Sequence, residues 1–352
     1  GYFDAMFGGF KGDEGCILPE VNLLDDDTVQ FVLSEPLYVL PTILSMPSFA
    51  IASPAAIQAG TLAEHPVGSG PFKFLDRVSG INIDLEADPA YWGTPTSLSL
   101  LQFVVIPASE DRLQALLDGS IDSSGDLTIE HALIAVDQPS LQVQWRESDK
   151  LGYLGINSAV PGLSDPQVRQ AIAHAINLPG LIANHYPFGS QPADQFLPSA
   201  IWGRDPELDG YSYDPDLSVS LMSQAGYTDV YTTTLAYRNV VRAYLPDPPA
   251  VAEDIRASLQ QVGIDATIVV YESAEFLDAW VNGELELFLL GWGADYLHPD
   301  NFFSPILCDP NNLGFGPLDL TLCALVQNAR SDPDTLDQLA LYQDASQRVY
   351  DT

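Results

Sequence analysis

The chain has 352 residues, long enough for two or three domains, and its 46% of hydrophobic and 10% of aromatic residues are typical of an ordered globular protein. Thirteen Lys and Arg against 48 Asp and Glu give a net charge of −35, which argues against nucleic-acid binding because such binding depends on cationic side chains. This acidity is typical of a solvated surface in high salt or at low pH, where the repulsion between the charges is screened or neutralised. The alternative is that the protein binds a polycation. The sequence has no uncharged apolar run of about 18 residues and so predicts no membrane span.

The first third of the chain is expected to form strands and turns. Its opening residues, GYFDAMFGGF, lack an initiator Met, a basic segment and an apolar segment, so no signal peptide is predicted. A turn at residues 25–27 leads into a strand that alternates through Val29 and Phe31. Three further strands are predicted, around Phe72 and Phe74 and at residues 81–88 and 98–107.

The middle of the chain adds helices. Residues 109–122 predict a helix that ends at Gly119, a residue that readily adopts the left-handed conformation. Residues 164–182 predict another, with Asp165 as its N-cap and Pro166 in its first turn.

The last third predicts a separate α/β lobe. Strands and helices alternate through residues 232–237, 249–264, 265–272, 273–283 and 284–290. This order is typical of a mixed or parallel sheet covered by helices, in which ligands bind at the carboxyl ends of the strands. The final strand changes character at Gly291, where the segment GWGADYLHPDNFF begins and places Asp295 just beyond the strand end.

Catalytic and metal-binding patterns are not apparent. The sequence contains neither a G-x-S-x-G elbow nor a G-x-x-x-x-G-K-[ST] phosphate loop, and its five histidines do not have metal-ligand spacing. We therefore predict no catalytic residue, no metal site and no cofactor. Cys308 and Cys323 enclose a turn-rich loop that a disulfide could close, the alternative being two unpaired thiols, whereas Cys16 has no obvious partner.

Several segments resemble, in one order, the peptide- and nickel-type extracellular solute-binding proteins of ABC importers, family 5. HPVGSGPFKF is similar to the family's "GTGPY/F" strand, and YWGTPTSLSLLQFVVIPASEDRLQALLDGSID to its turn, strand and "A-L-x-x-G-x-I-D" helix end. SDPQVRQAIAHAIN resembles the "D-x-x-V-R-Q-A" helix, and YDPDLSVSLMSQAGY the "Y-D-P" helix. GWGADYLHPDNFF resembles "G-W-x-x-D-x-x-D-P-x-N-F", with His298 in place of an acidic residue.

The resemblance implies an α/β, two-lobed fold of the periplasmic-binding-protein type, with mixed sheets and a ligand cleft between the lobes. Residues 1–65 would be the remainder of a small extra lobe, residues 66–230 a first α/β lobe, and residues 231–352 a second lobe with the hinge and the start of a return segment. Relative to the family pattern the chain looks truncated at both ends. The implied protein is not an enzyme but a monomeric receptor, extracellular, periplasmic or lipid-anchored at the outer face of the membrane. It would deliver short peptides to an ABC transporter permease.

The closest likeness is to dipeptide-binding members, and it assigns site residues. It implies that Arg242, in RAYLPDP, holds the ligand's carboxylate and that Asp295 holds its α-ammonium, with Gly291, Trp292 and Gly293 beside them. It also matches Cys308 and Cys323 to a cysteine pair of these proteins.

Both charges suit their predicted partners, since arginine binds carboxylates bidentately and an aspartate supplies the opposite charge. Alternatives remain: Arg242 could pair on the surface with Asp247 or Asp254, Arg238 could take its role, and Asp295 could be a simple cap. The solute could instead be a nickel chelate or a sugar, or the fold could be an assembly component with a vestigial cleft.

Overall fold

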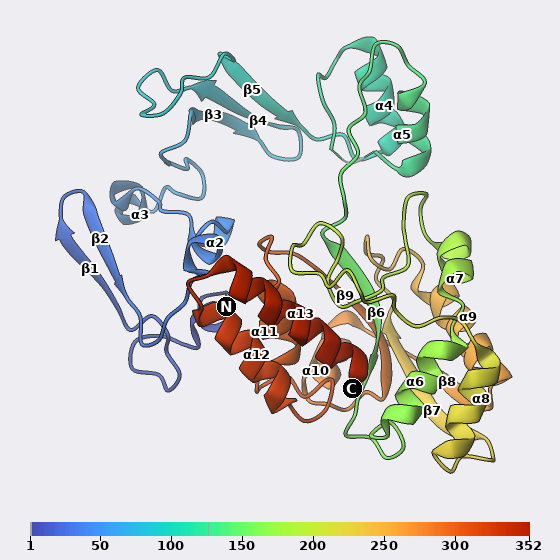
Figure 1. Ribbon diagram of the computed structural model, residues 1–352. Helices are drawn as coiled ribbons and strands as arrows, with labels where there is room; N and C mark the ends of the chain where they lie inside the picture. Colours follow the sequence, from blue (N-terminus) through green and yellow to red (C-terminus); the bar gives the residue numbers. More distant parts are fainter. Residues whose placement is uncertain (1, 126) are drawn as a thin grey trace. The chain divides into compact units, whose positions relative to one another are not determined.

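The computed structural model describes residues 2–125 and 127–352, which form two compact units (Figure 1). One unit runs up to Ser48 and resumes from Glu147 to the C-terminus, and the other comprises Phe49–Arg146. Among the described residues, no helix is both long and apolar enough to cross a membrane.

The smaller unit is built on a three-stranded antiparallel sheet in the order β3-β4-β5. Its elements are α3 (Pro54–Ala59), β3 (Phe72–Val78), β4 (Asn82–Ala87), β5 (Leu100–Val104), α4 (Ser109–Asp118) and α5 (Ile129–Val136). The three strands expected between residues 72 and 107 are confirmed, and α4 ends, as predicted, at Gly119 in the left-handed conformation. His131 Nδ1 lies 2.8 Å from Ser109 Oγ and so ties α5 to the first turn of α4.

The larger unit has a four-stranded mixed sheet in the order β6-β9-β7-β8. Its strands are β6 (Lys150–Ile156), β7 (Tyr231–Arg238), β8 (Ile264–Tyr271) and β9 (Leu287–Gly293). β7 runs parallel to β8 and to β9, whereas β6 is antiparallel to β9. The sheet thus draws strands from both sides of residue 230, and the lobe boundaries expected from the sequence stay predictions.

The strand predicted at residues 284–290 forms later in the chain than expected. Glu284 still belongs to the turn that closes the preceding helix, because its N–H donates to the carbonyl of Ala279 at 2.9 Å. At the other end the strand continues past Gly291, since Trp292 and Gly293 pair with Leu151 and Lys150 of β6.

Side chains of this sheet alternate between two apolar layers. Leu287 and Leu289 belong to the layer with α6, α8 and α9, whereas Phe288 and Leu290 belong to the layer with α10. The helices of this part are α6 (Pro166–Ala175), α7 (Leu178–His185), α8 (Pro215–Gln224), α9 (Pro248–Gln261) and α10 (Ser273–Val281). Asp165 caps α6 as predicted, accepting the N–H of Gln167 at 2.9 Å.

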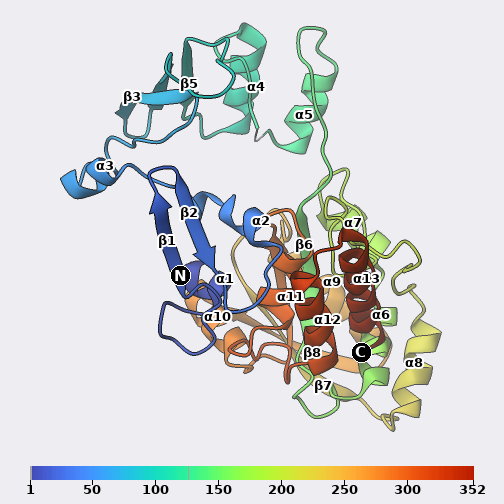
Figure 2. The same cartoon turned by 60° about the vertical axis from the view of Figure 1, so that its left-hand side comes forward.

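A third apolar cluster packs the last three helices, α11 (Asp300–Leu307), α12 (Leu320–Ser331) and α13 (Thr335–Asp351). α12 and α13 lie side by side in both views (Figures 1 and 2). The predicted disulfide between Cys308 and Cys323 is present, with a Cα–Cα distance of 5.4 Å, and joins the end of α11 to α12.

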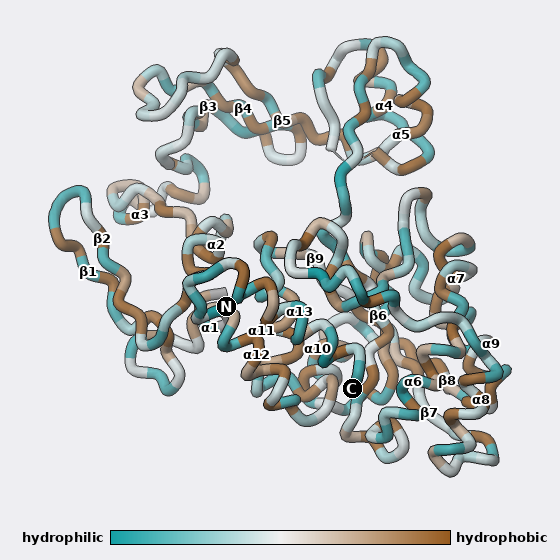
Figure 3. The backbone as a smooth tube through the Cα atoms, viewed as in Figure 1, coloured by the Kyte–Doolittle hydropathy of each residue, from teal (hydrophilic) through white to brown (hydrophobic). Residues whose placement is uncertain are grey.

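The N-terminal part of this unit contains a short hairpin and helices. Its elements are α1 (Tyr2–Phe7), β1 (Glu20–Asp25), β2 (Thr28–Val32), α2 (Leu40–Leu44) and a 3-10 turn at Pro47–Phe49. Figure 3 shows apolar stretches along β1 and β2, and these residues are solvent-exposed, with Leu23 at 74%. The following segment is tied to α12, because the N–H of Tyr38 donates to the carbonyl of Arg330 at 2.8 Å.

Reduction of the disulfide should destabilise the larger unit. The crosslink closes a loop of 15 residues, and the entropy of that loop corresponds to about 3 kcal/mol in the free energy of unfolding. We expect urea unfolding to show this loss when a reductant is added. A double variant, Cys308→Ala with Cys323→Ala, should be equally destabilised and insensitive to reductant; unchanged stability in both experiments would contradict the prediction.

Candidate functional site

Asp295 lies where the sequence predicts, directly beyond the carboxyl end of β9. The strand's last residue, Gly293, pairs with Lys150, and the N–H of Ala294 donates to the carbonyl of Asp149 at 3.0 Å. The chain then leaves the sheet in a turn that leads into α11. β6 therefore holds this segment in register up to the residue before Asp295.

The turn is held at its other end, where α11 begins, by the buried side chain of Asn301. Its Oδ1 accepts the backbone N–H of Asp295 at 2.8 Å and the indole Nε1–H of Trp292 at 3.1 Å. Asn301 is fully buried in the first turn of α11. Sequence reasoning did not single it out, although it is the asparagine in the "D-P-x-N-F" part of the segment.

The carboxylate of Asp300 is buried next to Asn301 and has several partners. Only 1% of Asp300 is exposed. Tyr296 donates its hydroxyl to Oδ2 at 2.8 Å, Ser304 donates to Oδ1, and Arg330 Nε of α12 lies 3.1 Å from Oδ1. Burial raises the pKa of the Tyr296 hydroxyl, and the neighbouring negative charge of Asp300 adds to that rise. The hydroxyl therefore stays protonated and keeps donating its hydrogen bond.

His298, the residue that departs from the family pattern, is part of the packed interior. Its ring meets Trp202 and Tyr342 edge-on, and its Nδ1 accepts the N–H of Asp300 at 3.2 Å. Burial lowers the pKa of His298 to about 4; the charge of Asp300 opposes this shift and that of Arg330 adds to it. His298 is thus a neutral packing residue near pH 7.

Gly291 lies under an aromatic ring. A Cβ on Gly291 would overlap the ring of Tyr244 and lie 2.5 Å from the carbonyl oxygen of Leu151. Its partner in the ladder, Gly152, lies under the backbone carbonyl of the same tyrosine. Because these two glycines have no side chain, the segment RAYLPDP can pack directly on the sheet.

The two candidate arginines both precede Tyr244 in the sequence. Arg238 closes β7 and donates to Ser273 Oγ at 3.0 Å and to the hydroxyl of Tyr244 at 3.3 Å. Arg242 is exposed and donates to the carbonyl of Val241 at 3.0 Å. Because β7 and β9 are parallel, Arg238 lies at the same edge of the sheet as Asp295.

The carboxylates considered as surface partners of Arg242 have other contacts. Asp247 caps α9, accepting the N–H of Ala250 at 3.2 Å, and Asp254 Oδ2 lies 2.9 Å from His185 Nε2. The structure therefore brings Gly291, Trp292, Gly293 and Asp295 into one fixed segment, with Arg242 on an exposed loop that rests on the same sheet.

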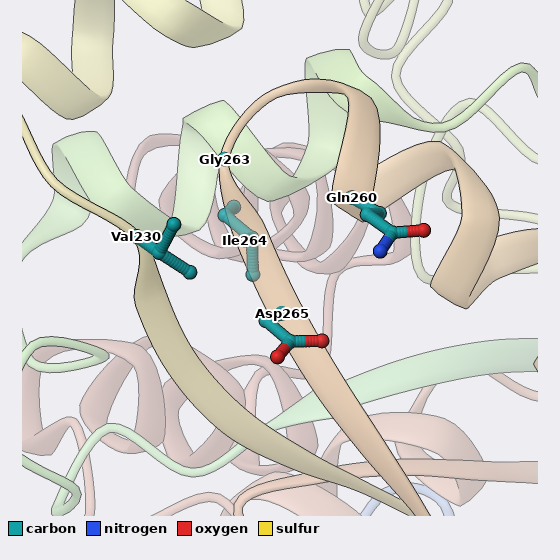
Figure 4. Close-up of a pocket in the computed structure, with 5 residues that line it drawn as sticks. All are labelled: Val230, Gln260, Gly263, Ile264 and Asp265. Atoms are coloured by element: carbon teal, nitrogen blue, oxygen red, sulfur yellow. The ribbon is translucent and has the colours of Figure 1, made fainter.

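A small hollow of about 150 Å³ lies elsewhere on this unit (Figure 4). It is lined by Val230, Gln260, Gly263, Ile264 and Asp265. These residues surround the amino ends of β7 and β8, the edge opposite to Asp295. The hollow is thus separate from the candidate site.

Substituting Gly291 should be costly, whereas substituting Gly293 should not. Gly291→Ala forces the ring of Tyr244 out of place, and such overpacking costs about 1–3 kcal/mol in unfolding free energy. A Cβ on Gly293 would lie 3.3 Å from Cγ of the flexible Lys150 side chain, so Gly293→Ala should change stability by less than about 0.5 kcal/mol. Chemical denaturation of both variants tests this, and equal effects would contradict it.

His298 should make the protein less stable in mild acid. Its pKa falls from an ordinary 6.5 to about 4 on folding, so between these values the unfolded chain binds a proton that the folded chain does not. Stability should therefore fall as the pH is lowered from about 6.5 to 4, by up to about 3 kcal/mol from this group. The stability difference between wild type and His298→Gln should shrink by this amount over that range; parallel pH profiles would refute the assignment.

Comparison with known proteins identifies relatives. A family model described as "Bacterial extracellular solute-binding proteins, family 5 Middle" matches residues 12–314. The Dipeptide-binding protein of Escherichia coli is 29% identical over 99% of this chain and 68% of its own length. Heme-binding protein A of Haemophilus influenzae is 30% identical over 88% of this chain and 57% of its own length. The chain therefore spans roughly two thirds or less of these relatives.

Solved structures agree. HbpA2 from Haemophilus parasuis has a TM-score of 0.88 at 28% identity, over 95% of this chain and 68% of that protein. DppA from Helicobacter pylori, solved in complex with the peptide STSA, has a TM-score of 0.73 at 28% identity, over 99% of this chain and 69% of its own. These likenesses confirm the α/β, two-lobed solute-binding fold class expected from the sequence. The chain belongs to the bacterial extracellular solute-binding proteins of family 5.

Proposed function

We propose that the protein binds short peptides at the carboxyl edge of the sheet β6-β9-β7-β8 and delivers them to an ABC importer. Asp295 would bind the α-ammonium and Arg242 the α-carboxylate, with the indole of Trp292 beside the ammonium. The observation that carries the proposal is the position of Asp295, fixed at the end of β9 at the edge to which the arginine-bearing segment also belongs. Binding is non-covalent and involves no cofactor.

The relatives support a peptide as the solute. The E. coli relative is a dipeptide-binding protein, and the H. pylori structure holds a tetrapeptide. Two charges of opposite sign would select a zwitterion of limited length, because each ligand charge that becomes buried on binding needs a partner. We further propose that its partner is the permease of an ABC transporter. The protein would lie outside the cell membrane, with or without a lipid anchor, and would be a monomer.

A second candidate is a large organic ligand of another class. HbpA2 has a TM-score of 0.88 to this chain, and heme-binding protein A is 30% identical to it. His298 gives this candidate no support as an exposed metal ligand, because it is 92% buried and its Nδ1 accepts a hydrogen bond. Titration with heme beside peptides distinguishes the two.

Calorimetric titration with dipeptides tests the peptide proposal. We expect Asp295→Asn and Arg242→Ala each to weaken binding by about 2–5 kcal/mol, since each leaves one ligand charge without its partner. N-acetylated dipeptides should lose affinity for the wild type and for Arg242→Ala, but little for Asp295→Asn. C-terminally amidated dipeptides should show the reverse dependence.

The controls lie away from the candidate site, Asp265 at the amino end of β8 and Arg256 on α9. Asp265→Asn and Arg256→Ala make the same changes of charge and should leave affinity unchanged. If Arg238→Ala weakens binding and Arg242→Ala does not, the carboxylate belongs to Arg238. A wild-type protein that binds no dipeptide would exclude the proposed function.

A further inference from the structure

We infer that Asn301 is a positioning residue for ligand selection, because it fixes the direction of Asp295 and the plane of Trp292 by two hydrogen bonds to one buried oxygen. The inference rests on the proposed function, in which Asp295 receives the ligand's ammonium. Asn301 touches no ligand in this scheme. It acts only through the two residues that do.

The geometry concentrates two constraints on a single atom. Oδ1 of Asn301 accepts the N–H of Asp295 at 2.8 Å and the indole N–H of Trp292 at 3.1 Å. The first bond fixes the backbone at Asp295, and hence the direction of its Cα–Cβ bond. The second fixes the rotation of the indole about its own side chain. The indole of Trp292 and the backbone of Asp295 are thereby held at a constant spacing.

The position of Asn301 is itself rigid. It is fully buried between Asp300 and Phe302, which are 1% and 0% exposed. Asp300 is held by Tyr296, Ser304 and Arg330, so the first turn of α11 cannot rotate without breaking a buried ion pair. The hydrogen bonds of Asn301 transmit this rigidity to the turn that carries Asp295.

No apolar side chain can replace Asn301 in this role. An aliphatic residue would leave two donors without an acceptor, and an unsatisfied buried donor is costly. An aspartate would keep the acceptor but would bury a second carboxylate beside Asp300. A site that binds a charge must hold its partner to about half an ångström, so the loss of this acceptor should appear as lost selectivity.

The test compares Asn301→Ala with Asn312→Ala. Asn312 is a matched control, a 7% exposed asparagine beyond α11 whose side chain also makes two hydrogen bonds, to Ile306 and Gly314. Asn301→Ala should lower the preference for a free-amine dipeptide over its N-acetyl form at least about tenfold, whereas Asn312→Ala should leave the preference unchanged. Both should lose stability, so stability alone does not distinguish them.

A measurement without ligand separates this inference from the proposed function. In Asn301→Ala, amide hydrogen exchange at Asp295 should be at least about tenfold faster than in the wild type. Trp292→Phe removes the indole donor but leaves the bond from Asp295 to Asn301 in place, so that exchange should stay protected. Asn301→Ser, whose shorter side chain withdraws the oxygen, replaces Asn301→Ala in both measurements if the alanine variant does not fold.

Unchanged exchange at Asp295, or an unchanged amine preference in a variant that still binds peptide, overturns the positioning role. If the wild type binds no dipeptide, the proposed function fails and with it the effect on selectivity, while the exchange measurement still decides whether Asn301 fixes Asp295. Faster exchange together with a lost amine preference, both absent from Asn312→Ala, supports the inference.

Discussion

The buried carboxylate of Asp300 is the constraint on which the candidate site depends. Burying a carboxylate is costly unless its oxygens have partners, and here two hydroxyls and the guanidinium of Arg330 are those partners. These partners come from the turn before α11, from α11 itself and from α12. One charge therefore locks three segments together, and the backbone carbonyl of Arg330 extends the link to Tyr38. This network holds the first turn of α11 in place, and Asn301 in that turn fixes the backbone of Asp295 by a hydrogen bond.

The part of the candidate site that carries Arg242 depends on two glycines, which have no side chain. Gly152 and Gly291 face each other in the β6–β9 ladder, and Tyr244 fills the space above them. The hydroxyl of Tyr244 accepts a hydrogen bond from Arg238, and the packing of the ring on the glycines holds the segment that carries Arg242 on the sheet. An apolar core thus supports both halves, while a buried polar network positions the negative side and a glycine gap positions the positive side. Each half of the candidate site is specified by contacts between segments that are distant in sequence rather than by a local loop sequence.

Local patterns were sufficient to predict much of this fold. The strands now seen as β7 and β8, the N-cap at Asp165 and the end of α4 at Gly119 all follow from residues close in sequence. The role of Asn301 could not be derived in this way, because its function depends on where Trp292 and Asp295 return in space. The extension of β9 through Gly293 depends likewise on pairing with β6, which is distant in sequence.

The same limit applies to His298, which the sequence shows only as a departure from the family's acidic residue. It is buried against Trp202 and Tyr342, neither of which a local pattern connects to it.

The extreme acidity of the chain fits a zwitterionic ligand better than an anionic one. Several of its thirteen cationic side chains already neutralise carboxylates, including Arg204 with Asp194 and Arg348 with Asp319. An anion approaching Arg242 would meet the repulsive field of the remaining charge, which slows association. A dipeptide zwitterion carries no net charge, so this field acts on it only through its dipole. In the proposed binding mode Asp295 would attract the ammonium and Arg242 the carboxylate, and the two attractions together would orient the dipeptide at this edge of the sheet.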